Sequence, residues 1–133
     1  MLSPRFHQTI CVLNGCIYVI GGVTTGMSFL STVECYDPQT DQWTFKKSLP
    51  RTAAAPAAEV VNGIIYVFIE NETYAYDPNT DEWTRKANIP STGGFEAWTT
   101  RSGTVDGIVY LFGAQGRSDR KSTRLNSSHA TLS

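Results

Sequence analysis

The chain has 133 residues, of which 41% are hydrophobic and 17% are charged, a composition typical of a globular protein rather than a disordered one. Residues 1–116 hold seven Lys and Arg against eleven Asp and Glu, and this mildly acidic balance argues against a nucleic-acid partner. The longest apolar runs are strand-length and the N-terminus has no apolar leader, so we expect no membrane partner either.

The first unit, residues 1–50, alternates short apolar runs with turn signals. Asn14-Gly15 tolerates positive φ at both residues and predicts a two-residue hairpin. Asp37-Pro38 supplies the first two positions of a type I turn, which leads to Trp43. We expect four strands, at 7–13, 16–21, 31–36 and 42–47.

The second unit, residues 51–90, repeats the first. The phrase YDPQTDQW at 36–43 returns as YDPNTDEW at 76–83, which gives a period of 40 residues between Trp43 and Trp83. Strands are expected at 53–61, 64–69, 73–76 and 82–87. Ile69-Glu70 replaces the first unit's Gly21-Gly22, and the segment from Gly to Tyr is eight residues shorter. We therefore expect a tight turn at residues 70–72, with little loop for binding.

A third unit, residues 91–116, is incomplete. It has the hairpin signal Asp106-Gly107 and an apolar run, with strands expected at 97–104 and 108–112, but it lacks the YDP phrase.

The apolar runs have no polar face, so each strand must be covered on both sides. Four-stranded antiparallel sheets repeated in series, each covered by its neighbours, describe a β-propeller. The elements that recur in order closely resemble the kelch repeat over residues 1–116. Those structural motif residues are Gly15, Gly21, Gly22, Tyr36, Asp37, Pro38, Trp43, Gly63, Tyr76, Asp77, Pro78, Trp83 and Gly107.

The predicted fold class is thus all-β, with about two and a half four-stranded antiparallel blades of a kelch-type propeller. Because propellers typically have four to eight blades, we expect this chain to be a piece of a longer propeller, whose remaining blades in the parent chain are its partners. Alone, the open blade faces would aggregate or associate with other blades.

Residues 117–133 carry five serines, four basic residues and few apolar ones, so we expect a disordered tail. The stretch also resembles a tail that recurs on unrelated machine-translated sequences, where adapter bases have been read through. We interpret it as foreign to the protein.

Few residues suggest chemistry. His7 is the one histidine before the tail, and we interpret it as structural; the Asp37/Asp41 and Asp77/Asp81 pairs fit turn capping. Cys11, Cys16 and Cys35 lie in expected strands and are interpreted as reduced core thiols, which favours a cytoplasmic location. We expect no metal, no cofactor and no catalytic residue.

The remaining candidates are surface loops. In kelch propellers the loops between second and third strands, and between blades, project on one face and commonly bind partners. Transferred to this chain, the resemblance implies a protein-binding face. Its candidate residues are Met27, Phe29, Arg5, Arg51 and Phe95.

Two functions follow from the resemblance. The first is a non-catalytic protein-interaction module, similar to the BTB-kelch substrate adaptors of ubiquitin ligases. The alternative is a carbohydrate-active kelch enzyme such as a sialic-acid mutarotase, with Glu59 and Arg101 in a central channel. The repeat phrase is common to both kinds, so it does not choose between them.

Overall fold

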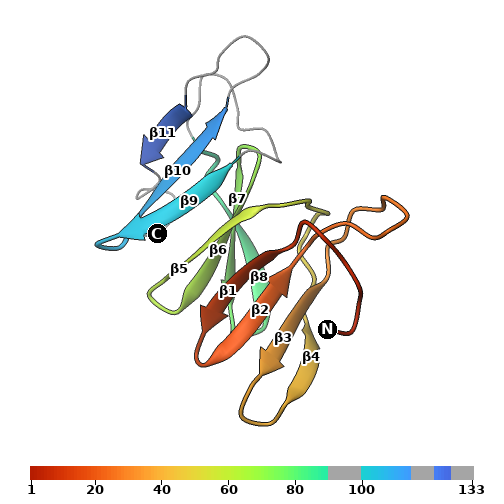
Figure 1. Ribbon diagram of the computed structural model, residues 1–133. Coiled ribbons are helices and arrows are strands. Elements are labelled where there is room, and N and C mark those ends of the chain that lie inside the picture. Colours follow the sequence, from red (N-terminus) through yellow and green to blue (C-terminus); the bar gives the residue numbers. More distant parts are fainter. Residues whose placement is uncertain (90–99, 115–121, 127–133) are drawn as a thin grey trace.

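The structure is a computed structural model, and it describes residues 1–89, 100–114 and 122–126, the last five and residues 113–114 by their backbone alone. Every regular element among these residues is a β-strand (Figure 1). The strands are β1 (Thr9–Leu13), β2 (Cys16–Ile20), β3 (Val33–Asp37), β4 (Gln42–Lys46), β5 (Ala57–Val61), β6 (Ile64–Ile69), β7 (Glu72–Asp77), β8 (Glu82–Lys86), β9 (Arg101–Val105), β10 (Ile108–Ala114) and β11 (Ser122–Asn126).

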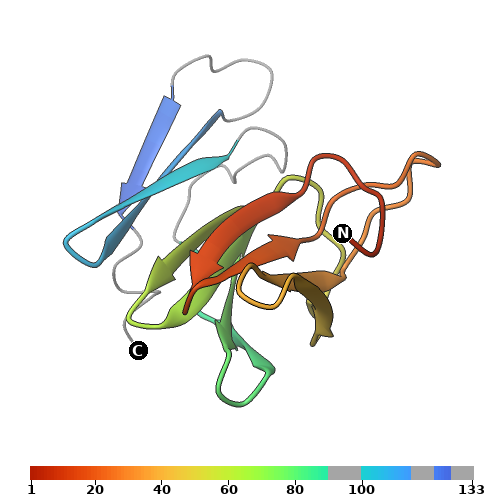
Figure 2. The ribbon, with the colours of Figure 1, turned by 60° about the horizontal axis from the view of Figure 1, so that its bottom comes forward.

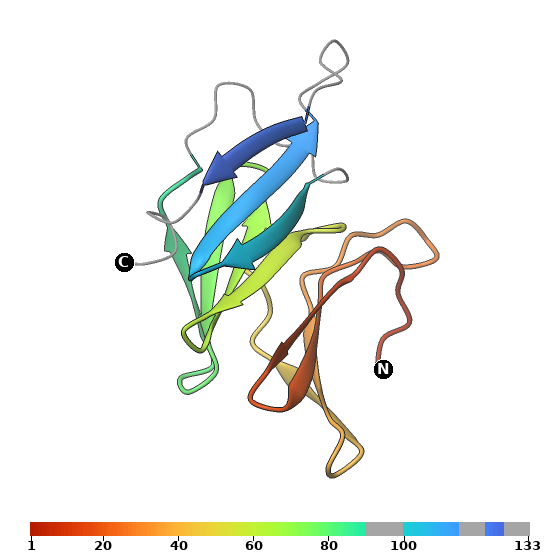
Figure 3. The same ribbon diagram turned by 60° about the vertical axis from the view of Figure 1, so that its left-hand side comes forward.

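The strands form three antiparallel sheets, each running in sequence order from its inner to its outer strand. Blade 1 has the order β1-β2-β3-β4, blade 2 has β5-β6-β7-β8, and blade 3 has β9-β10-β11. The first strands β1, β5 and β9 lie next to one another, and the sheets fan out from them (Figures 1 and 3). This arrangement confirms the predicted all-β, propeller-type fold.

The hairpins form where the sequence predicted them. Asn14 and Gly15 have φ of 52° and 76°, and Asn62 and Gly63 have 51° and 77°, as a type I′ turn requires. The expected tight turn of blade 2 is also present, because β6 ends at Ile69 and β7 starts at Glu72.

The core lies between the blades. One cluster joins Tyr18 and Ile20 of blade 1 to Ile65 and Tyr76 of blade 2, all with at most 6% of their surface exposed. The rings of Tyr18 and Tyr76 meet edge to face at 5.9 Å between centroids. A second cluster joins blade 2 to Val109 and Leu111 of blade 3. Each internal sheet face is thus buried by its neighbour.

The tail differs from the expectation at one segment. Ser122–Asn126 pairs with β10 as an antiparallel edge strand, although we expected no order there. Edge pairing uses backbone N–H and C=O groups, so a polar segment can add to a sheet without a buried side chain. The origin of the tail stays a prediction. The tail residues before and after this strand lie outside the described residues.

Candidate partner-binding face and inner cleft

The loop between β2 and β3 is a structured extension of their hairpin. Phe6 and Val23 exchange two backbone hydrogen bonds, of 3.0 and 2.8 Å, and Val23 also bridges to Phe29. At the loop tip, Thr24 N–H donates to Ser28 O (3.0 Å) and Met27 N–H donates to Thr24 O (2.9 Å). The tip is therefore held by its own backbone and projects away from the sheet (Figure 2).

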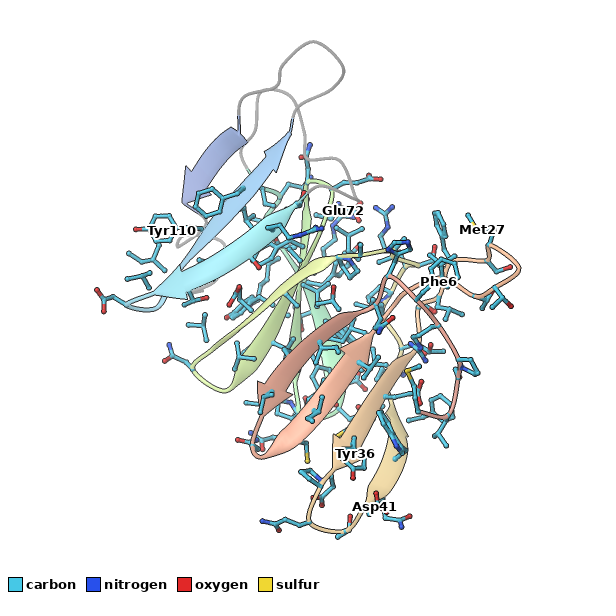
Figure 4. The ribbon with its side chains drawn as sticks, viewed as in Figure 1. Phe6, Met27, Tyr36, Asp41, Glu72 and Tyr110 are labelled. Carbon is cyan, nitrogen blue, oxygen red and sulfur yellow. The ribbon has the colours of Figure 1, made fainter. Side chains whose placement is uncertain are left out.

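Three large apolar side chains lie on this projection or beside its base. Met27 is 66% exposed, Phe29 47% and Phe6 37%. Figure 4 shows Met27 at the loop tip with Phe6 beside the base of the loop. Aromatic and Met side chains are the types enriched at the centres of protein interfaces. We call these three residues the loop face.

Sequence reasoning named Met27 and Phe29 but missed Phe6. The bridge from Phe6 to Val23 aligns the chain before β1 with the β2–β3 loop, and this pairing places Phe6 on the same surface. The one available signal was the position of Phe6 directly after Arg5, in the segment already assigned to the loop end of the blade.

Arg5 does not lie on a binding surface, contrary to the prediction. Its side chain is fully buried in an ion pair with Glu34, whose side chain is also fully buried. Nη1 of Arg5 donates to Gly21 O (2.9 Å) and Thr32 O (3.1 Å). A buried guanidinium needs a carboxylate and acceptors of this kind, so the residue ties the β2–β3 loop to β3 instead of facing solvent.

Arg51 remains partly exposed, at the equivalent place of blade 2. It pairs with Glu72 at 2.8 Å and with Glu70 at 3.7 Å. Glu72 also accepts a hydrogen bond from the Tyr74 hydroxyl at 2.7 Å. The hydrogen bonds from Arg51 and Tyr74 hold the pKa of the Glu72 carboxyl below its usual value. Phe95, the last candidate, lies outside the described residues.

A cleft of about 420 Å³ opens along the inner strands β1, β5 and β9. Its lining includes His7, Glu59 and Arg101, one residue from each blade. The Thr104 hydroxyl donates to the Glu59 carboxylate at 2.9 Å. The structure thus brings Glu59 and Arg101 to one cleft, which can hold a polar ligand of small size.

The other polar groups have structural roles. Asp37 and Asp77 each accept the backbone N–H two residues later, at 2.9 Å, as expected for turn capping. The Tyr36 and Tyr76 hydroxyls donate to Asp41 and Asp81, at 2.7 and 2.8 Å. In the described part of the chain, no three His, Cys, Asp or Glu side chains form a group suited to a metal ion. Nor do those residues include a helix of the length and apolarity needed to span a bilayer.

The blades, with their Gly-containing loops and the Tyr-Asp-Pro hairpins, define repeat units of a β-propeller. The kelch motif matches residues 4–50. Residues 4–50 thus carry a kelch motif, and the chain is similar to kelch-repeat proteins.

Three relatives illustrate the match. An F-box/kelch-repeat protein, SKIP30 of Arabidopsis thaliana, is 44% identical over 68 residues, 50% of this chain and 19% of that protein. Beta-scruin of Limulus polyphemus is 34% identical over 67 residues, 50% of this chain and 7% of its own length. The human kelch repeat and BTB domain-containing protein 2 is 39% identical over 75 residues, 56% of this chain and 12% of its length. The match thus spans less than a fifth of each relative.

The structure is also similar to that of YjhT. The TM-score is 0.72 with 16% identity, and the likeness covers 92% of this chain and 52% of YjhT. At this identity the comparison supports the fold alone.

Proposed function

We propose that this chain is a non-catalytic protein-interaction module, which binds a partner protein through the loop face of Phe6, Met27 and Phe29. The observation that carries the proposal is the ordered β2–β3 loop, which holds two of these apolar side chains exposed although its own backbone is hydrogen-bonded. A rigid loop loses little conformational entropy on binding, so its exposed apolar surface contributes more fully to affinity.

The names of the relatives support a function in protein interaction. F-box and BTB domains stand beside kelch repeats in the names of two of them. By this resemblance, the partner is a substrate protein and the full-length protein is a ubiquitin-ligase adaptor. Arg51 stays a candidate, because its side chain remains 35% exposed although it is paired with Glu72. Phe95 also stays a candidate.

The test uses the full-length protein. Met27→Asp with Phe29→Asp should abolish capture of the partner, because two carboxylates replace the apolar centre of the interface. Thr40→Asp with Asn79→Asp is the matched control, since it adds the same charge at exposed hairpin turns away from the loop face. The loop-face variant should bind the captured partner at least about 30-fold more weakly than the unaltered protein does, as expected for interface hot spots. Equal affinity of both variants would remove the assignment.

The inner cleft favours a second candidate, a carbohydrate-active enzyme. Glu59 and Arg101 line one cleft of about 420 Å³, and a carboxylate and a guanidinium that reach the same ligand can move a proton at a sugar hydroxyl and stabilise negative charge. The test follows sugar anomer exchange by NMR with the full-length protein and its Glu59→Gln variant. Exchange at the buffer rate with the unaltered protein would exclude this candidate.

A further inference from the structure

The first two strands of each blade are joined by an inner hairpin, and two of these hairpins turn on the dipeptide Asn-Gly. Asn14-Gly15 joins β1 to β2 and Asn62-Gly63 joins β5 to β6, and all four residues are exposed. Glycine has no Cβ to obstruct the approach of its backbone nitrogen to the preceding side-chain amide. The surrounding structure adds no obstruction, because a Cβ built at Gly15 or Gly63 would meet nothing within 4 Å. Both dipeptides therefore have the chemistry of deamidation sites.

Deamidation of an Asn-Gly pair proceeds through a succinimide ring. The Gly nitrogen bonds to Cγ of the Asn side chain, the Cγ–Nδ2 bond breaks, and the amide nitrogen leaves as ammonia with the Gly N–H proton. Water then opens the ring. Attack of water at Cγ gives Asp, and attack at the backbone carbonyl carbon gives isoaspartate, in which the chain runs through Cβ and Cγ. Solvent water is the only other reactant.

The folded hairpins oppose ring closure. Asn14 and Asn62 have φ of 52° and 51°, and the first central residue of a type I′ turn has ψ of about +30°. At that ψ the Gly nitrogen lies on the far side of the Cα–C bond from the Asn side chain, so it does not reach Cγ. The ring closes only after the hairpin has opened, and the rate of deamidation therefore follows local unfolding.

The third inner hairpin shows which product the fold accepts. Asp106-Gly107 joins β9 to β10 with φ of 52° and 74°, nearly the same values as in the two Asn-Gly turns. An aspartate thus already occupies this turn position in blade 3. Deamidation to Asp adds a charge at an exposed turn and leaves the backbone and the strand pairing as they are.

Isoaspartate does not fit the same turn. It lengthens the backbone between two residues that pair across the hairpin, Leu13 with Cys16 in blade 1 and Val61 with Ile64 in blade 2. Because a two-residue loop sets the register of its hairpin, a longer backbone shifts the pairing. The shift moves Leu13 or Val61, each 6% exposed, out of the core. Damage at Asn62 reaches both neighbouring blades, since β5 lies between β1 and β9.

We propose that Asn14 and Asn62 are sites of spontaneous deamidation, which the folded hairpins protect. Once modified, each site gives an Asp form that keeps the fold and an isoaspartate form that opens the blade. The proposal rests on the geometry of the inner hairpins and is independent of the loop face and of the inner cleft.

The first test incubates the full-length protein at mildly alkaline pH, in buffer and in urea, and follows each asparagine by peptide mass spectrometry. In urea, Asn14 and Asn62 should lose their amides at least about 10-fold faster than Asn79, which a branched threonine follows. In buffer, both sites should react at least about 10-fold more slowly than in urea, because the hairpins must open first. Equal rates at the three asparagines in urea overturn the proposal, as do equal rates in buffer and urea.

The second test separates the two products. Protein aged in buffer is digested briefly with a protease that cuts opened molecules, and electron-transfer fragmentation distinguishes Asp from isoaspartate in the intact fraction. Asp at residues 14 and 62 should be retained there, and isoaspartate should be depleted at least about 5-fold, because it exposes buried strand residues to cleavage. Isoaspartate at undiminished levels in the intact fraction overturns the proposal, as does the absence of both products after prolonged ageing.

Asn62→Asp is the matched variant, since it makes the Asp product directly. It should keep the melting temperature of the unaltered protein, because Asp106 occupies the same turn position in blade 3 with the same φ. A lowered melting temperature would show that the turn of blade 2 does not accept the Asp product and would overturn this part of the proposal.

Discussion

The indole Nε1–H of Trp83 donates a hydrogen bond of 2.8 Å to the carbonyl oxygen of Lys47, which lies 36 residues earlier in the chain. Beside it, the Asp81 carboxylate accepts the Lys47 backbone N–H at 2.9 Å. The last hairpin of blade 2 thus holds both polar groups of the residue that follows β4 of blade 1. In the repeated phrase, Asp and Trp connect consecutive blades as well as forming a turn.

Trp83→Phe should destabilise the chain by about 1 kcal/mol beyond the effect of lost ring area, because the Lys47 carbonyl loses its partner. Urea unfolding measures the change. Trp43→Phe is the matched control, since in the described part of the chain no earlier blade offers Trp43 an equivalent carbonyl. Equal losses for the two variants would show that the inter-blade bond contributes nothing.

Breaking the Arg5–Glu34 pair should be among the most damaging substitutions. Arg5→Met leaves the Glu34 carboxylate buried without its counter-charge, at a cost of about 3–5 kcal/mol. The double variant Arg5→Met with Glu34→Leu should recover part of this loss, because no unpaired charge remains. Urea unfolding of the two single variants and the double variant tests the coupling, and strictly additive losses would contradict it.

Asp81 should make stability depend on pH in the acid range. The Lys47 N–H and the Tyr76 hydroxyl hold the pKa of the Asp81 carboxyl below its ordinary value of about 3.9. The carboxylate therefore stabilises the fold above that pH, and this contribution is lost as the pH falls through the lowered pKa. Asp81→Asn should be less stable than the unaltered chain at pH 6, and the difference should shrink below about pH 4.

Unfolding free energies measured between pH 6 and the acid limit of folding check this prediction. Asp41→Asn is the matched variant of blade 1, because Asp41 accepts from the Tyr36 hydroxyl but has no counterpart of the Lys47 N–H among the described residues. The loss of unfolding free energy at pH 6 should be smaller for Asp41→Asn than for Asp81→Asn. A difference for Asp81→Asn that stays constant over the whole range would disprove the assignment.

Gly21→Ala should destabilise the chain by more than about 1 kcal/mol. Gly21 has a φ of 65°, and a Cβ there would lie 2.5 Å from the Ala53 carbonyl oxygen in the loop that leads to blade 2. Gly26→Ala is the control, because its nearest neighbour would be Thr24 Oγ1 at 3.8 Å. Thermal unfolding compares the two, and an undiminished melting temperature for Gly21→Ala would contradict the close approach.

Cys11 and Cys35 should react slowly while the chain is folded. Burial raises the pKa of the Cys11 thiol to about 12 and, with a hydrogen bond that the Cys35 thiol makes to Cys16, that of the Cys35 thiol to about 11. At pH 8 little thiolate is present at either residue, so iodoacetamide should modify them far more slowly than in urea. Peptide mass spectrometry over time reports each site, and rapid labelling of the folded chain would contradict this.

Local chemistry explains what could be predicted. Asn14-Gly15 and Asn62-Gly63 form hairpins because these residue types accept positive φ wherever they stand. Residue counting also predicted that the loop between the second and third strands is shorter in blade 2 than in blade 1. In the structure β6 ends at Ile69 and β7 begins at Glu72.

The candidate site was predictable only in part, because exposure depends on distant partners. Arg5 and Arg51 look equivalent in sequence, yet Arg5 is buried since β3 of blade 1 presents Glu34 to it. Blade 2 offers Arg51 the more exposed Glu72 instead.

By itself, the sequence determined the repeat, the hairpins and the all-β class, because these depend on backbone preferences and apolar patterns within about ten residues of each other. Only the tertiary structure decided that Trp83 bonds to Lys47, that Phe6 joins Met27 on the loop face, and that β1, β5 and β9 line a common cleft. These relationships join different strands and blades, and their geometry is set by how the sheets pack.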